Sequence, residues 1–398
     1  MSTSKAISFE EAVRAACEGE IDREAAGVLI RARPGDELDS LMAEAALLRD
    51  RLKGISITYS RKVFIPLTNL CRDYCGYCTF RKDPGDAGAR TMTPEDVLAV
   101  AEAGGRLGCK EALFSLGDRP EALFTEMREQ LQAFGYKTTL SYLGEVTRRV
   151  LDETGLLPHS NPGLMARADL ETLRRSNPSL GLMLETISQR LGGPGMAHDN
   201  APDKAPPLRL KVIEEAGRLR IPFTTGILIG IGETLEERVE SLLAIRKLHD
   251  RYGHIQEVII QNFRAKPDIP MRDHTEPDLH DLARTIAVAR LILREMNVQA
   301  PPNLSDENYP FLLLAGINDW GGISPLTRDY INPEKPWPHI EALRYRTQEA
   351  GLELRERLSV YPEYVHDGDF MDAAVAEKTR AMADSQGYAR AHTRTAEA

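Results

Sequence analysis

The chain has 398 residues, of which 42% are hydrophobic, and a formal net charge of -10 at pH 7. This length allows one large α/β barrel or two ordinary domains, with a sizeable core in either case. The acidic balance, together with the absence of a lysine and arginine run interleaved with aromatic residues, argues against nucleic acid as a partner.

The cysteine content and the apolar stretches indicate where the protein works. Three of the five cysteines lie in one short loop, which does not suit a disulfide framework. We expect the remaining two, Cys17 and Cys109, to be small buried or partly buried side chains. The N-terminus has no signal-peptide pattern, and the longest apolar stretches, 226–232 and 311–317, are too short to span a membrane. The sequence therefore predicts a soluble, cytoplasmic protein that binds no membrane.

The first 56 residues read as helical. An amphipathic stretch at 37–52 carries an apolar stripe that includes Leu38, Leu41 and Ala45. We expect 1–56 to form a helical cap packed on the main domain.

From about residue 57 to 337, short apolar runs alternate with helical segments, which is the rhythm of a parallel sheet. The chain is therefore predicted to form an α/β fold of the (β/α)8 TIM-barrel type. Residues 338–398 are expected to form C-terminal helices with a frayed tail. The eight expected strands are Lys62–Leu67, Glu111–Leu116, Leu156–Asn161, Leu180–Glu185, Phe223–Ile229, Glu257–Asn262, Val298–Asn303 and Leu312–Ile317.

The loop after the first strand carries Cys71, Cys75 and Cys78 at C-x3-C-x2-C spacing. Thiolate is the soft ligand preferred by zinc and iron–sulfur clusters. A structural zinc site needs four protein ligands, and no histidine lies between Arg72 and Leu157 to supply the fourth. Three cysteines on a four-iron cluster instead leave one iron open for a small molecule. That spacing is the signature of radical S-adenosylmethionine (SAM) enzymes, and the aromatic Tyr77 before the last cysteine fits it.

Unusual residues follow the next four strands, at the barrel end where active sites of this fold lie. Each also has a structural interpretation, because glycines serve tight turns, buried carboxylates pair with cations and histidines are often satisfied by loops. Their joint position favours a site. The residues are Gly117, Asp118, His159, Asn161, Glu185, Gly230 and Gly232.

The last three strands are followed by amides, carboxylates and a lysine. Such groups suit a ligand held by many hydrogen bonds, such as a pyrimidine with a polyol chain, although some of them can simply cap loops. The candidate substrate contacts here are Gln261, Asn262, Lys266, Asn318 and Asp319.

From about Ile57 to Pro338 the chain resembles the radical SAM subunit of deazaflavin (FO) synthase that releases the finished chromophore. The resemblance rests on ITYSRKVFIPLTNLCRDYCGYCTF from Ile57, IPFTTGILIGIGET from Ile221 and QNFRAKP from Gln261. The stretch GINDWGGISPLTRDYINPEKPWP from Gly316 is the most discriminating. Asp118 stands where many relatives have glutamate.

The resemblance implies a [4Fe-4S] cluster on Cys71, Cys75 and Cys78, with SAM on the open iron. It implies a 5′-deoxyadenosyl radical acting on 5-amino-5-(4-hydroxybenzyl)-6-(D-ribitylimino)-5,6-dihydrouracil. Ring closure with loss of ammonia would give 7,8-didemethyl-8-hydroxy-5-deazariboflavin (FO). An adduct-forming radical SAM subunit and a low-potential donor, ferredoxin or flavodoxin, are the implied partners.

The same resemblance assigns residues to the two ligands. Contacts to SAM are expected from Tyr77, Gly117, Asp118, Glu185, Arg209, Gly230 and Gly232. Contacts to the substrate are expected from His159, Asn161, Gln261, Asn262, Lys266, Asn318 and Asp319.

Other hypotheses remain open on the sequence alone. The chain could be the adduct-forming partner, or another radical SAM barrel related to biotin synthase or the hydrogenase maturase. A zinc-binding structural protein would hold one zinc per chain. An electron carrier would need a fourth cysteine, and neither Cys17 nor Cys109 has a spacing that recommends it.

Overall fold

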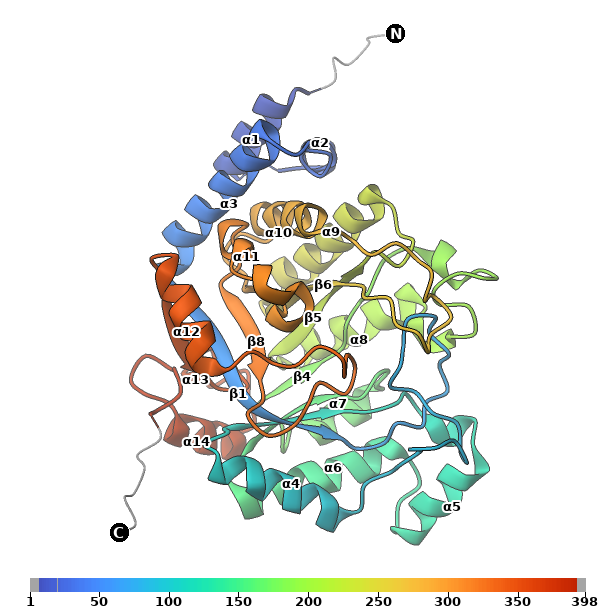
Figure 1. The fold of residues 1–398 in the computed structure, drawn as a ribbon. Helices are drawn as coiled ribbons and strands as arrows, with labels where there is room; N and C mark the ends of the chain where they lie inside the picture. Colours follow the sequence, from blue (N-terminus) through green and yellow to red (C-terminus); the bar gives the residue numbers. More distant parts are fainter. Residues whose placement is uncertain (1–6, 20, 392–398) are drawn as a thin grey trace.

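The computed structural model describes residues 7–19 and 21–391 (Figure 1). Two of the expectations concern residues outside these ranges. They are the lack of a signal peptide at the start of the chain and the fraying of the last part of the tail. None of the helices within the described ranges is long and apolar enough to cross a membrane.

The central element is a closed barrel of eight parallel strands. Its strands follow the order β2-β3-β4-β5-β6-β7-β8-β1, and pairing of β1 with β2 closes the ring. The fold class predicted from the sequence is confirmed. The strands are β1 (Ser56–Pro66), β2 (Glu111–Ser115), β3 (Leu157–Asn161), β4 (Ser179–Gly181), β5 (Phe223–Ile229), β6 (Ile255–Asn262), β7 (Val298–Gln299) and β8 (Asp319–Ile323).

Helices surround the barrel because each crossover between parallel strands must cover the sheet (Figure 1). Several begin with a capping box, such as Thr93 with Asp96 before α4 and Thr234 with Glu237 before α9. These surrounding helices are α4 (Pro94–Arg106), α5 (Thr125–Ala133), α6 (Thr139–Arg149), α7 (Arg167–Leu173), α8 (Pro206–Arg218), α9 (Leu235–Tyr252), α10 (Leu279–Leu293) and α11 (Phe311–Leu314).

Three N-terminal helices, α1 (Phe9–Glu18), α2 (Arg23–Leu29) and α3 (Asp36–Lys53), pack beside the barrel helices α9 and α10 (Figure 1). The apolar stripe expected at 37–52 lies on α3, where Leu38, Leu41 and Ala45 are buried. This second layer explains why α10 is buried on nearly all of its faces.

Strand β4 ends at Gly181 rather than at the expected Glu185, and the last two barrel strands also differ from prediction. The expected strand Leu312–Ile317 is wrong, because 311–314 is the short helix α11 and the strand β8 begins only at Asp319. Short apolar runs do not distinguish a buried strand from a buried helix turn. The expected strand Val298–Asn303 shrinks to β7 because Pro301 and Pro302 follow it, and proline cannot donate to a sheet ladder.

The C-terminal segment forms the expected helices and one strand that was not expected from the sequence. Strand β9 (Glu353–Arg357) pairs in parallel with the first half of β1, from Ser56 to Ser60. The Ser179 hydroxyl at the start of β4 donates to the Ser359 carbonyl at 2.5 Å, so this segment closes the N-terminal end of the barrel. The helices here are α12 (Ile340–Glu349), α13 (Pro362–Val365) and α14 (Ala373–Met382).

Candidate active site

A cavity of about 310 Å³ opens at the C-terminal ends of the barrel strands. Cys71, Cys75 and Cys78 all line it, and so do residues at the ends of β2, β3 and β6. We call it the cluster cavity. Its position is the one at which TIM-type barrels carry their active sites.

The cysteine loop is held close to the barrel by the neighbouring strand end. A Cβ atom on Gly117, just after β2, would lie 1.9 Å from the Leu70 carbonyl oxygen, so only glycine lets the two segments approach this closely. The backbone N–H groups of Asp73 and Asp118 donate to the Cys71 sulfur at 3.4 and 3.1 Å. Such hydrogen bonds stabilise a metal-bound thiolate and tune the metal centre.

The spread of the sulfurs tests which metal centre fits. A single tetrahedral zinc with Zn–S bonds of about 2.3 Å places its sulfurs about 3.8 Å apart. Among the described residues, only the carboxylates of Asp73, Asp118 and Asp203 bring three potential ligand atoms within 4.8 Å of one another. The three cysteine sulfurs are therefore too widely spaced for one zinc, and they fit a larger iron–sulfur cluster.

The electrostatics of the thiols agree with a buried inorganic centre. Burial raises the pKa of Cys71 to about 12, and it also raises the pKa of Cys75. The thiols of Cys71 and Cys75 are thus protonated at neutral pH when no metal is bound, and cluster assembly must release these protons. The nearby His198 is hydrogen-bonded to the Tyr77 hydroxyl at 3.1 Å, and burial lowers its pKa to about 3.

Glu185 places a charged group in the cavity wall, beside two cations. Its carboxylate accepts from the Lys204 ammonium at 2.5 Å and lies 4.0 Å from the Arg209 guanidinium. Burial alone would raise the pKa of Glu185, but the charges of Lys204 and Arg209 outweigh it and hold the pKa below its usual range. The carboxylate is therefore ionised. A polar ligand in the cavity can bind to it and to the two neighbouring cations.

An acidic cluster lies directly behind the cysteine loop. Asp73, Asp118 and Asp203 converge there, and Arg72 and Arg119 supply the opposing charge to Asp203. Burial and the charge of Asp203 raise the pKa of Asp118 to about 7. Asp73 and Asp203 were not among the predicted site residues, although one lies within the cysteine motif.

The substrate side of the cavity contains four of the predicted contacts: Asn161, Gln261, Asn262 and Lys266. The Asn262 amide donates to the Leu304 carbonyl at 3.1 Å. Between these polar groups the wall is apolar. It includes Phe64, Phe80, Leu113, Leu116, Leu182, Leu228, Ile259 and Phe263.

His159, Gly230 and Gly232 do not line the cluster cavity. His159 lies inside the barrel, where its Nδ1 is 2.7 Å from the Ser179 hydroxyl and burial lowers its pKa to about 4. The two glycines have φ of 90° and 103° and shape the turn after β5. The Glu233 carboxylate accepts from the Gly230 backbone N–H at 2.8 Å, so this turn is stabilised internally.

Asn318 and Asp319 lie at the opposite end of the barrel from the predicted site. Asp319 begins strand β8 and Asn318 directly precedes it, whereas the expected strand Leu312–Ile317 would have placed both after a strand. The Asn318 side chain accepts from the Val298 backbone N–H at 2.9 Å, and Asp319 pairs with Arg357 at 2.7 Å. The structure therefore corrects both predicted substrate contacts to residues that hold the barrel together.

The two remaining cysteines stay away from the cluster cavity. The Cys17 thiol on α1 donates to Glu44 at 3.2 Å, and Cys109 is buried just before β2, at the other end of that strand. Within the described part of the chain, the cysteines that line the cavity are Cys71, Cys75 and Cys78.

Comparison with known proteins agrees with this site. Residues 65–245 match the Radical SAM superfamily. A 7,8-didemethyl-8-hydroxy-5-deazariboflavin synthase of Methanopyrus kandleri is 52% identical over 334 residues, which cover 84% of this chain and 100% of that relative. The chain belongs to the deazaflavin (FO) synthase family. This membership confirms the resemblance recognised in the sequence and its cofactors, a [4Fe-4S] cluster and SAM.

Other FO synthase family members are longer proteins. The FO synthase of Streptomyces avermitilis is 52% identical over 393 residues, covering 95% of this chain and 45% of that protein. The chain thus spans about half the length of such relatives. Among solved structures, the FeFe-hydrogenase maturase HydG from Carboxydothermus hydrogenoformans superposes with a TM-score of 0.69 at 18% identity. That match covers 93% of this chain and 87% of HydG, and it supports the fold alone.

Proposed function

We propose that this chain forms FO from 5-amino-5-(4-hydroxybenzyl)-6-(D-ribitylimino)-5,6-dihydrouracil by a radical SAM reaction. The observation that carries the proposal is the 52% identity over the full length of the Methanopyrus deazariboflavin synthase. The cysteine-lined cavity supports it, because the residues that line it suit a radical enzyme with a polar organic substrate.

The finer chemistry belongs to the same proposal. The reaction closes a ring and releases ammonia, which makes the enzyme a carbon–nitrogen lyase. A second radical SAM protein supplies the adduct, and ferredoxin or flavodoxin supplies the electron. The chain is proposed to work in the cytoplasm, where thiols stay reduced.

The cysteines Cys71, Cys75 and Cys78 would hold the cluster. When bound, the cluster and SAM would supply a 5′-deoxyadenosyl radical for hydrogen abstraction from the adduct. Glu185 and Arg209 would bind the sugar and carboxylate of SAM. Their charges are already paired in the cavity wall, so little reorganisation is needed when the ligand arrives.

The substrate side orients the adduct and excludes water. Asn161, Gln261 and Asn262 offer amide donors and acceptors to a uracil ring, and Lys266 offers a cation. The apolar wall between them keeps water from the reacting atoms and so limits side reactions of the intermediates.

Anaerobic reconstitution tests the proposal. The protein is loaded with iron and sulfide, reduced, and given SAM with the benzyl-uracil adduct. We expect 5′-deoxyadenosine and deazaflavin fluorescence together. 5′-Deoxyadenosine without fluorescence would move the assignment to the adduct-forming reaction or to another radical barrel. Neither product, with zinc bound in the cysteine loop, would reject the proposal altogether.

A further inference from the structure

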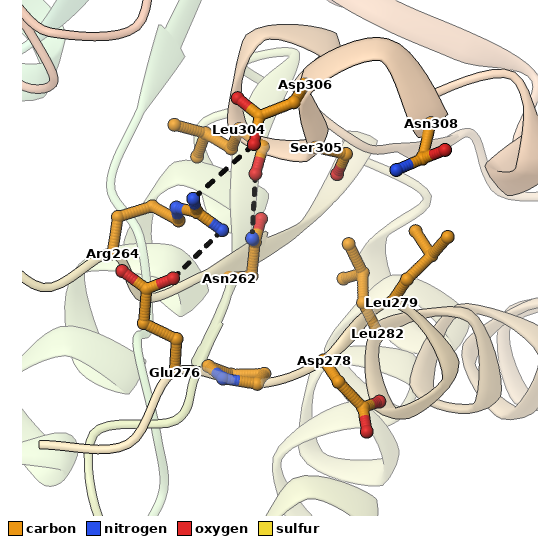
Figure 2. Close-up of a pocket in the computed structure, with 11 residues that line it drawn as sticks. Asn262, Arg264, Glu276, Asp278, Leu279, Leu282, Leu304, Ser305, Asp306 and Asn308 are labelled. Atoms are coloured by element: carbon orange, nitrogen blue, oxygen red, sulfur yellow. Dashed lines mark hydrogen bonds and ion pairs between the residues drawn. The ribbon is translucent and has the colours of Figure 1, made fainter.

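A second cavity lies next to the cluster cavity, at the ends of β6 and β7. We call it the side cavity; its volume is about 290 Å³. Three segments build it: the residues after β6, the start of α10 and a helical segment at Pro302–Asn308 with a kink at Ser305 and Asp306 (Figure 2). Its lining residues are Asn262, Arg264, Glu276, Pro277, Asp278, Leu279, Leu282, Leu304, Ser305, Asp306 and Asn308.

The two cavities share a wall. Asn262 and Arg264 line both of them. Arg264 is held there by ion pairs to Glu276 at 3.0 Å and Asp306 at 3.6 Å (Figure 2). The two cavities are therefore adjacent, and a ligand that occupies both has to pass these two side chains.

Polar atoms in the side cavity lack partners. The Asn262 side-chain oxygen and the Ser305 hydroxyl are buried and have no hydrogen-bond partner among the described residues. Asn262 is only 4% exposed, so water does not reach it freely from outside. A buried polar atom left unpaired costs roughly 1–3 kcal/mol. Such atoms in a native structure call for a ligand or a bound water.

The character of the lining selects the class of ligand. The lining contains three carboxylates, those of Glu276, Asp278 and Asp306, but one cation, Arg264, and this excess of negative charge disfavours an anion such as phosphate. The unpaired atoms comprise an acceptor and a hydroxyl, and a hydroxyl both donates and accepts. Leu279 and Leu282 of α10 lie across the cavity from Arg264 and can contact a carbon chain (Figure 2). A neutral polyhydroxy chain satisfies all of these conditions.

We propose that the side cavity is the subsite for the ribityl chain of the substrate, while the uracil and benzyl parts occupy the cluster cavity. This proposal rests on the proposed function for the identity of the substrate. Each cavity alone lies at the lower limit of ligand pockets, which begin near 300 Å³, and the two together are large enough for the whole adduct. Ser305 and Asn262 hydrogen-bond the hydroxyl groups of the chain.

The test compares two ligands on one variant and its matched control. The ligands are the ribityl adduct and an analogue whose side chain is a methyl group. The variant is Ser305→Ala, which alters the side cavity alone, and Ser40→Ala on the exposed face of α3 is the matched control. Dissociation constants are measured on the reconstituted enzyme with SAM but no reductant, so that binding is separated from turnover. Turnover of the ribityl adduct by the wild type is measured in parallel.

We expect Ser305→Ala to weaken binding of the ribityl adduct about five- to tenfold, the cost of one lost hydrogen bond. Binding of the methyl analogue should not change, which also shows that the variant folds. Equal effects on both ligands, or none, would overturn the subsite. Absence of deazaflavin from the wild type with the expected binding pattern would reject the proposed function but keep a polyol subsite. No measurable binding of either adduct by the wild type would reject both.

Discussion

Glu185 has an unusual backbone conformation and lines the cluster cavity. Its φ of 64° lies in the left-handed region, which costs a residue other than glycine roughly 1–3 kcal/mol. Two backbone hydrogen bonds to β5 hold it there: its N–H donates to Gly226 at 3.1 Å, and its carbonyl accepts from Leu228 at 2.9 Å. The strained turn directs the carboxylate into the cluster cavity, where it meets Lys204.

Replacing Glu185 with glutamine keeps the shape of the side chain and removes its charge. The ammonium of Lys204 would then lack its buried counter-charge, and SAM would lose an acceptor. We expect the KM for SAM in 5′-deoxyadenosine formation to rise about tenfold or more, as for the loss of a charge-assisted hydrogen bond of 1.5–3 kcal/mol. Glu102→Gln, on the exposed face of α4, is the control. A lower melting temperature with an unchanged KM would mean that Glu185 has only a structural role.

At the scale of the single residue, a functional side chain can be predicted when the sequence around it is unusual. Three cysteines in one loop, and Glu185 after an apolar strand, stand out without a structure. Lys204 does not stand out, because it lies in a segment without periodicity. Its role depends on Glu185, which is 19 residues away in the chain. Asp203 acquires its importance in the same way, through the fold.

Strand β9 contributes Arg357 to a buried network of ion pairs at the N-terminal end of the barrel. Arg357 on β9 pairs with Glu257 at 2.9 Å and with Asp319 at 2.7 Å. Two carboxylates thus share one guanidinium. Thr224 and Tyr361 each donate to Glu257 at 2.9 Å, which satisfies its oxygen atoms.

This arrangement predicts a pH-dependent stability. Burial and the charge of Asp319 raise the pKa of Glu257 to about 7, from its ordinary value of 4.5, despite the opposing charge of Arg357. Between about pH 4.5 and 7 the folded chain therefore holds more protons than the unfolded chain. The contribution of Glu257 to stability falls as the pH rises through this window. Glu257→Gln should remove that loss, so its melting temperature relative to the wild type should increase by on the order of 2 °C from pH 6 to pH 8.

Melting curves of the reconstituted proteins between pH 6 and 8 check this expectation. Glu353→Gln, at the exposed start of β9, is the control and should follow the wild type at each pH. A constant difference between Glu257→Gln and the wild type across the range would show that Glu257 stays ionised throughout.

Strand β9 shows why some elements escape sequence reasoning. Its residues, Glu353 to Arg357, are mostly charged and have low strand propensity. They form a strand because the backbone of β1 extends beyond the barrel and offers unpaired groups from Ser56 to Ser60. Only the tertiary structure supplies that partner, so the segment was expected to be helical.

At the scale of the molecule, the two ends of the barrel have separate tasks. The C-terminal segment closes one end with buried ion pairs, while the strand ends at the other carry the cluster cavity and the side cavity. The alternation of strands and helices predicts this division, because parallel strands bring their C-terminal ends to one side. Which loop approaches which cavity depends on side-chain contacts between distant segments, and the periodicity of the sequence does not encode those contacts.

The single three-cysteine loop leads to a last prediction, about which of the two radical reactions this protein carries out. The chain covers all of the Methanopyrus relative but about half of the Streptomyces FO synthases. We expect it to convert the supplied adduct without a second protein, and to form no deazaflavin from tyrosine and ribityl diaminouracil. Its one set of three cysteines allows one radical-generating centre in the described chain. Fluorescence from the second mixture should appear only after the adduct-forming radical SAM protein is added. Fluorescence without that protein would mean that this one cavity performs both radical reactions.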